Sequence, residues 1–198
     1  MNTWGLLAPG PSACADGLEG LPLGVIGNAF ELAPWADFAA SSDSAWWRRY
    51  PKAMDIPRRY SMLQTPDVER VRIPELGSTV NSGVLGLECA VRLGATRILL
   101  VGFDMRGSHF FGPYENGLRN TQPHQRAQHL KQYEAWARYR RAEVINCTEG
   151  SAINCFPRKS LDACLAELAA HRSGEARSVR QRLPEARVSG GGGVPRFA

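Results

Sequence analysis

The segment WGLLAPGPS, residues 4–12, decides the fold of this chain. A short apolar run that ends in a turn of glycine, proline and serine is typical of a first strand in an α/β domain, with a helix next. Free N–H groups at a helix start bind anions such as phosphate. Gly10 lets a ligand approach the backbone, and Ser12 can cap the helix or donate to a phosphate. The segment therefore predicts either a phosphate site at Gly10, Pro11 and Ser12 or a purely structural turn.

Length and composition indicate one globular domain. The chain has 198 residues, of which 43% are hydrophobic and 22% are charged, values that are ordinary for a folded domain with a sizeable core. No apolar run approaches the roughly 18 residues of a membrane span, and the N-terminus has no signal-peptide pattern. The five cysteines are scattered without a CxxC pair. We expect reduced thiols in a cytoplasmic protein, with neither a disulfide framework nor a zinc site.

Most of the net charge of +5 lies at the C-terminus. Residues 171–198 carry six arginines against two glutamates, and four glycines follow one another at 190–193. This composition predicts a flexible Arg/Gly-rich tail at 173–198 after a nearly neutral domain at 1–172. A solvated tail is favoured over a nucleic-acid-binding arm, so we expect no nucleic-acid partner.

Strand-like and helix-like segments alternate along the chain. Strands are predicted at 4–7, 24–27, 36–40, 97–101 and 143–146, with shorter ones at 61–63 and 71–73. Helices are predicted after the first strand and at 46–49, 81–93, 124–141 and 159–170. This alternation favours a single Rossmann-like α/β domain with a mostly parallel sheet and helices on both faces. The polar loop at about 105–123 is long enough to be a lid over a site at the carboxyl ends of the strands.

Polar residues follow the predicted strands at the edge where ligands bind. Asn28 could hydrogen-bond a base, sugar or phosphate, or could cap a short helix. Ser82 is predicted to cap the next helix whether or not a ligand binds there. Hydrogen-bond donors at this helix start could also bind phosphate. Asp104 could orient the lid by accepting N–H bonds, or could serve a substrate. The wider set of candidates at these ends is Ser12, Asn28, Ser42, Asp43, Asn81, Ser82, Gly83 and Asp104.

The four histidines differ in context. His109 lies in the predicted lid, and His124 follows Pro123 where the lid meets a helix. A histidine that faces back toward the pocket from there can act as a general base near neutral pH. His129 and His171 lie within predicted helices and are interpreted as ordinary surface or core residues.

Several well-known motifs are absent from the sequence. It contains no Asp-x-Asp, no metal-ligand spacing, no Gly-x-Ser-x-Gly and no Walker loop. Their absence argues against metal-dependent glycosyl transfer, serine hydrolysis and P-loop phosphoryl transfer.

In order and spacing, the short motifs over residues 4–158 resemble the bacterial lipooligosaccharide sialyltransferases, which use CMP-sialic acid. The same Gly-Pro-Ser loop is also seen in uncharacterised phage and prophage proteins. The motifs that carry the resemblance are Gly10-Pro11-Ser12, Gly27-Asn28-Ala29-Phe30, Ser42 to Trp47, Asn81-Ser82-Gly83-Val84, Gly102-Phe103-Asp104, His124 and Asn146-Cys147 through Ser151.

The resemblance implies a metal-independent glycosyltransferase of one Rossmann-like domain. It implies a nucleotide-activated sugar, first of all a CMP-sugar, as donor, a carbohydrate as acceptor and no further cofactor. A homo-oligomer is compatible with it. Residues at the positions of Asn28 and Ser82 would contact CMP, and His124 would be the general base.

The sequence departs from the family pattern at several positions. Pro9 stands where the family has an asparagine in the first loop, and Ser42 stands where another asparagine is expected. Arg106 replaces one lid tyrosine, and a residue near His109 or Phe110 replaces the other. Arg106 would supply positive charge to a phosphate where the family has a phenol. The alternatives are a Mg²⁺-dependent pterin pyrophosphokinase-like transferase, which shares a Gly-Pro-Ser loop and a strand ending Gly-x-Asp, and a non-catalytic phage binding or assembly protein.

Overall fold

The computed structural model describes residues 1–115, 117–139 and 142–182. The chain divides into two compact units, residues 1–163 and 164–198. The first unit holds the sheet and the candidate site. The second begins within helix α4 (Leu161–Arg182).

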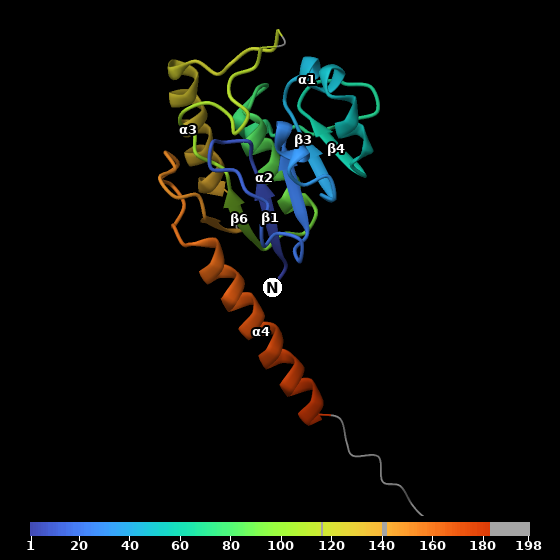
Figure 1. The fold of residues 1–198 in the computed structure, drawn as a ribbon, viewed down its shortest axis with the longest axis vertical. Coiled ribbons are helices and arrows are strands. Elements are labelled where there is room, and N and C mark those ends of the chain that lie inside the picture. The colour runs from blue at the N-terminus through green and yellow to red at the C-terminus, as the bar shows by residue number, and fades with distance from the viewer. Residues whose placement is uncertain (116, 140–141, 183–198) are drawn as a thin grey trace, which may run out of the picture. The chain divides into compact units, whose positions relative to one another are not determined.

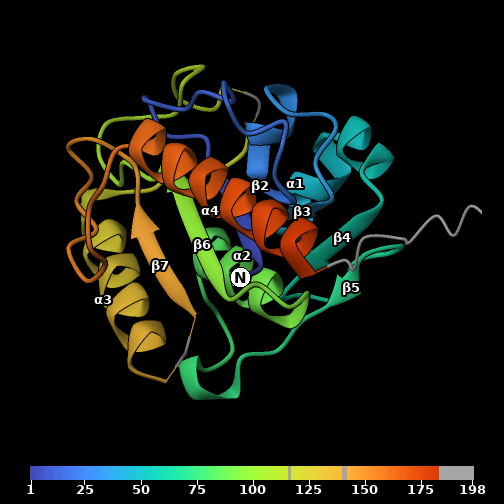
Figure 2. The same cartoon turned by 90° about the horizontal axis from the view of Figure 1, so that it is seen from below.

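All seven strands of the sheet are parallel, in the order β5-β4-β3-β2-β1-β6-β7. Figure 2 shows them side by side from β7 to β5. The predicted Rossmann-like α/β domain is thereby confirmed. The strand bounds are β1 (Thr3–Leu7), β2 (Leu23–Ile26), β3 (Phe38–Ala40), β4 (Arg58–Ser61), β5 (Glu69–Arg70), β6 (Arg97–Val101) and β7 (Glu143–Asn146).

Helices and short 3-10 turns connect the strands (Figure 1). The α-helices of the first unit are α1 (Ser44–Arg49), α2 (Ser82–Arg92) and α3 (Pro123–Tyr139). The 3-10 helices are η1 (Gly27–Glu31), η2 (Pro51–Asp55) and η3 (Pro74–Leu76). No helix among the described residues is long and apolar enough to cross a membrane.

Both faces of the sheet are buried. Side chains alternate along a strand, so neighbouring residues of β1 enter different clusters: Leu6 packs with Leu85 of α2 and Trp136 of α3, and Leu7 packs with Phe30 and Trp46. This explains why the central strands read as continuous apolar runs.

Four of the predicted strands, at 4–7, 24–27, 97–101 and 143–146, agree with the structure to within one residue at each end. The predicted helix after the first strand is wrong, because residues 8–22 form only turns and irregular backbone. Three prolines and three glycines in that segment disfavour a helix. The two short strands predicted at 61–63 and 71–73 were placed too late in the chain, because β4 and β5 begin at Arg58 and Glu69. The apolar residues Val71 and Ile73 enter the core from the loop that follows β5.

The C-terminal helix is longer than predicted. The sequence predicts its end near residue 170, but α4 continues to Arg182. The first ten residues of the predicted tail are therefore helical. The remaining tail, residues 183–198, lies outside the described residues.

The strand order places a switch point between β1 and β6. From β1 the chain moves outward through β2 to β5, and it then returns to the other side of β1 as β6. Loops that leave adjacent strands in opposite directions open a crevice at their carboxyl ends, where ligands bind in open α/β sheets.

Candidate functional site

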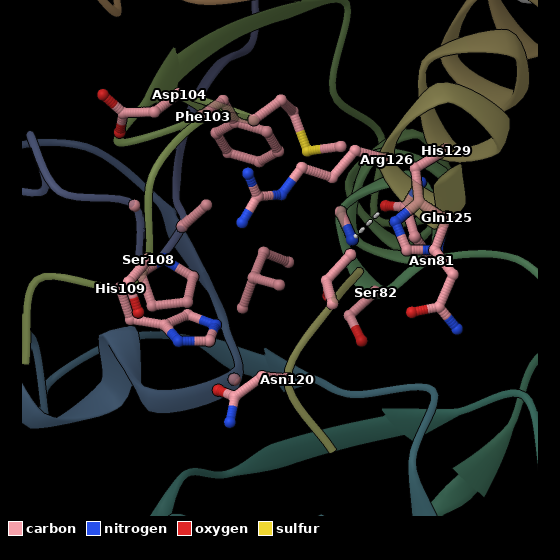
Figure 3. Close-up of a pocket in the computed structure, with 18 of the residues that line it drawn as sticks. Asn81, Ser82, Phe103, Asp104, Ser108, His109, Asn120, Gln125, Arg126 and His129 are labelled. Atoms are coloured by element: carbon pink, nitrogen blue, oxygen red, sulfur yellow. Dashed lines mark hydrogen bonds between the residues drawn. The ribbon is translucent and has the colours of Figure 1, made fainter. Parts of the chain in front are cut away.

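A cavity of about 620 Å³ lies at the carboxyl ends of β1, β2, β3 and β6 (Figure 3). The start of α2, the loop 102–121 and one side of α3 complete its wall. Its volume is within the range of pockets that bind small molecules and cofactors. The sequence-predicted residues that line it are Gly10, Ser42, Asp43, Asn81, Ser82, Gly83, Asp104, Arg106 and His109; Pro11, Ser12, Asn28 and His124 do not line it.

The Gly-Pro-Ser turn is fastened to Asp104. The backbone N–H and the hydroxyl of Ser12 donate to Oδ2 of Asp104 at 3.2 and 2.9 Å. A Cβ at Gly10 would lie 2.1 Å from that same oxygen and 2.3 Å from the Gly102 carbonyl oxygen, so this close approach requires glycine. Since no helix follows the turn, the predicted helix N-terminal phosphate site is absent. The structural alternative accounts for both Ser12 and Asp104.

Asn81, and not Ser82, is the N-cap of α2. Its Oδ1 accepts from the N–H groups of Gly83 and Val84 at 2.9 and 3.1 Å and from the Tyr133 hydroxyl at 3.1 Å. Its Nδ2 donates to Gln132 at 3.2 Å. The amide group of Asn81 is thus occupied within the protein.

Two serine hydroxyls, those of Ser42 and Ser82, lie beside this cap. The Ser82 oxygen accepts from the Ser42 N–H at 2.9 Å, which leaves the Ser82 hydroxyl proton available to donate. The Ser42 hydroxyl oxygen is buried and has no hydrogen-bond partner among the described residues. A buried hydroxyl without a partner costs free energy, so Ser42 is an unsatisfied group within the cavity wall, whereas the Ser82 hydroxyl can donate to a ligand.

Asn28 is a buried connector behind the pocket, with 2% of its surface exposed. Its Oδ1 accepts from Trp46 Nε1 at 2.7 Å and from the Tyr114 hydroxyl at 2.9 Å, and its Nδ2 donates to Glu31 at 2.7 Å. These hydrogen bonds disfavour the expected nucleotide contact, which stays a prediction, whereas the alternative of a helix cap is wrong because η1 has no side-chain cap. Asn28 instead positions Trp46 and Tyr114, which do line the pocket.

The loop 102–121 is held against the pocket at several points. The Phe110 N–H donates to the Pro9 carbonyl at 3.1 Å. The backbone of Tyr114 exchanges two hydrogen bonds with the Asn120 side chain, at 2.7 and 3.0 Å. From α3, the Arg126 guanidinium donates to the Gly107 carbonyl. These bonds describe a closed loop, and its mobility without ligand stays a prediction.

Positive charge dominates the lining. Arg106, Arg119 and Arg126 line the cavity, together with the carboxylates of Asp43 and Asp104. Both carboxylates accept hydrogen bonds from the protein: Asp104 from Ser12, and Asp43 from the Ala45 N–H at 2.7 Å. The guanidinium groups therefore favour an anionic ligand such as a phosphate.

His129, rather than His124, faces the pocket from α3. The lining residues Gln125, Arg126, His129 and Tyr133 fall within one side of a helix with 3.6 residues per turn. His124 lies about 100° outside that arc and is exposed, so the expectation that it faces the pocket is wrong. The aromatic Tyr133, one helical turn after His129, was the signal in the sequence that could have placed His129 on the inward side of the helix.

Hydrogen bonding fixes the tautomer of His109. Its Nδ1 lies 3.3 Å from the Gly112 carbonyl oxygen. A carbonyl only accepts, so Nδ1 carries the proton and Nε2 keeps its lone pair. The ring also stacks on Phe111, with 4.9 Å between ring centroids and an interplanar angle of 1°. The loop thus holds an oriented imidazole with a basic nitrogen at the cavity.

Burial disfavours the charged form of both pocket histidines. Burial lowers the pKa of His109, and the Arg126 charge lowers it further, against an opposing effect of the Gly112 hydrogen bond. Burial also lowers the pKa of His129. A neutral imidazole can accept a proton.

These lowered pKa values predict an acid-sensitive fold. In the unfolded chain each histidine takes up a proton near its ordinary pKa of about 6.5, whereas in the folded protein it does so only at lower pH. The free energy of unfolding should therefore decrease as the pH falls below about 6.5. Chemical denaturation at pH 7.5 and 5.0 measures the decrease. The double variant His109→Gln with His129→Gln should show a smaller one, and an unchanged decrease would contradict the assignment.

Among the described residues, no group of three or more His, Cys, Asp and Glu side chains is placed to hold a metal ion. No known protein family, curated protein or solved structure matches this chain.

Proposed function

We propose that the protein is a metal-independent glycosyltransferase that moves a sugar from a nucleotide-activated donor, first of all a CMP-sugar, to a carbohydrate acceptor. One observation carries the proposal. At the switch point of a parallel sheet, three arginines line the same cavity as an oriented, uncharged histidine. The first feature suits a leaving phosphate, and the second suits the removal of a proton from a hydroxyl.

The reaction follows from these groups. An acceptor hydroxyl oxygen attacks the anomeric carbon of the donor sugar, while the bond from that carbon to the donor phosphate oxygen breaks. The electron pair of the broken bond remains on the nucleotide phosphate, whose charge Arg106 and Arg126 stabilise. His109 Nε2 takes the acceptor proton, in place of the His124 that the resemblance implied. The Ser82 hydroxyl donates a hydrogen bond to the nucleotide-activated sugar.

The resemblance to the sialyltransferases supports the choice of CMP. The structure changes which residues would make the contact, since Asn28 is occupied by Trp46, Tyr114 and Glu31. Ser82 retains the role that the resemblance gives it.

A thermal-shift panel tests the donor class. We expect CMP and CMP-sialic acid to raise the melting temperature more than UMP, GMP or AMP, equally with Mg²⁺ and with EDTA. A ligand at one hundred times its Kd adds about 2.7 kcal/mol, which is roughly 5–11 °C for a domain of this size. The shift should shrink in Arg106→Gln, which alters the pocket, and persist in the control Arg138→Gln on the exposed side of α3.

Two other results would replace the proposal. A shift that requires Mg²⁺ would favour the pyrophosphokinase-like alternative. No shift with any nucleotide would favour a binding or assembly protein with this fold.

A further inference from the structure

A second cavity, of about 630 Å³, opens at η1, the end of α1 and η2. None of its lining residues lines the first cavity. Its floor is apolar and partly aromatic. Phe30 and Ile56 are buried there, with 6% and 2% of their surfaces exposed, and the rings of Phe30 and Tyr50 meet edge to face at 6.1 Å between centroids.

The rim of this cavity carries balanced charge. Two acidic residues, Glu31 and Asp55, and two basic residues, Arg49 and Lys52, line it. All four residues are exposed at the surface. The rim thus offers two groups that donate hydrogen bonds and two that accept them. It lacks the excess of positive charge found in the first cavity.

We propose that this second cavity binds an uncharged saccharide, as part of the acceptor. A sugar hydroxyl both donates and accepts, so it suits a rim of carboxylates with guanidinium and ammonium groups. The apolar face of a sugar ring suits a floor of aromatic rings. Two carboxylates would repel a phosphate, and four charged groups would lose water against a lipid chain. Neither ligand therefore fits the whole surface as well as a saccharide does. The role as acceptor site rests on the proposed function, whereas the saccharide class rests on the cavity alone.

The two cavities share a wall. Tyr50 of the second cavity lies 6.4 Å, between ring centroids, from Tyr114 of the first. Glu31 on the rim accepts from Asn28, which in turn accepts from the Tyr114 hydroxyl. To serve as acceptor, an oligosaccharide anchored at Tyr50 must therefore extend past Tyr114 into the first cavity.

Isothermal titration and ligand-observed NMR with lactose, maltotriose and tri-N-acetylchitotriose test the proposal, without any nucleotide present. We expect at least one of these neutral saccharides to bind the intact chain. Arg49→Ala and Asp55→Ala should each weaken it by about tenfold, the size expected for one lost hydrogen bond to a charged group. Arg48→Ala is the matched control, because Arg48 neighbours Arg49 on α1 and does not line the cavity.

Absence of binding for all three saccharides would overturn the proposal. So would equal loss in Arg48→Ala and Arg49→Ala, or preference for an anionic tri-galacturonate over the neutral trisaccharides. If the chain binds a saccharide but no nucleotide, the second cavity is a saccharide site. Only the glycosyltransferase proposal, with the acceptor role that rests on it, is then contradicted.

Discussion

His109→Gln should lower the rate of sugar transfer, or of donor hydrolysis where no acceptor is supplied, by about 10²–10⁴-fold. Glutamine keeps a polar side chain of similar reach but cannot accept the acceptor proton. Nucleotide affinity should change little, because the arginines and serines of the cavity are untouched. Rate measurements at saturating donor, together with nucleotide titrations, separate the two effects.

The pH dependence gives an independent check. Since burial and the Arg126 charge lower the pKa of His109, the rate should stay high as the pH decreases through 6.5 and fall only in more acidic solution. Arg126→Gln removes the positive charge beside His109, so the acid limb of the pH–rate profile should move toward higher pH.

The other histidines are the controls. His129→Gln should leave most of the activity, because none of the described residues hydrogen-bonds its ring and fixes its tautomer. His124→Ala should be fully active, since His124 is exposed and does not line the cavity. Loss of activity in His124→Ala, with activity retained in His109→Gln, would return the base to the position that the resemblance implied.

The fold could be predicted from local patterns because its central strands are buried on both faces. The runs at 4–7 and 97–101 are strand-like without any knowledge of their partners. The wrong predictions lie where contacts with a distant part of the chain determine the local structure. The segment after β1 forms no helix, and it is fastened by Asp104, 92 residues from Ser12 in the sequence.

In the candidate site, too, local sequence predicted some features and distant residues decided the others. Strand-end positions indicated the correct edge of the sheet, so Gly10, Ser42, Ser82 and Arg106 do line the cavity. Which side chains remain free could not be predicted, because Asn28 and Asn81 have their amides occupied by distant residues such as Tyr114 and Gln132. Whether His124 or His129 faces the pocket depends on which side of α3 packs against it, and this rotation of the helix was not predicted.

Asn28→Asp should destabilise the protein by about 2 kcal/mol at pH 7. The new carboxylate would face Glu31 where Nδ2 now donates at 2.7 Å, and two carboxylates at that distance cannot both stay charged without a penalty. Solvent screens part of this repulsion because Glu31 itself is exposed. The melting temperature should fall by roughly 4–8 °C, and the nucleotide-dependent shift should weaken as Tyr114 loses its fixed position.

Glu31→Gln in the Asn28→Asp background should restore stability. The glutamine amide then donates to the aspartate, while the aspartate still accepts from Trp46 and Tyr114, so every hydrogen bond of the connector is rebuilt with the direction of one reversed. Glu31→Gln alone should resemble the natural protein, since a glutamine oxygen still accepts from Asn28. Acid should also relieve the single variant, because one proton shared by two carboxyl groups removes their repulsion. If the double variant is as unstable as Asn28→Asp alone, the bond to Glu31 does not hold the wall between the two cavities.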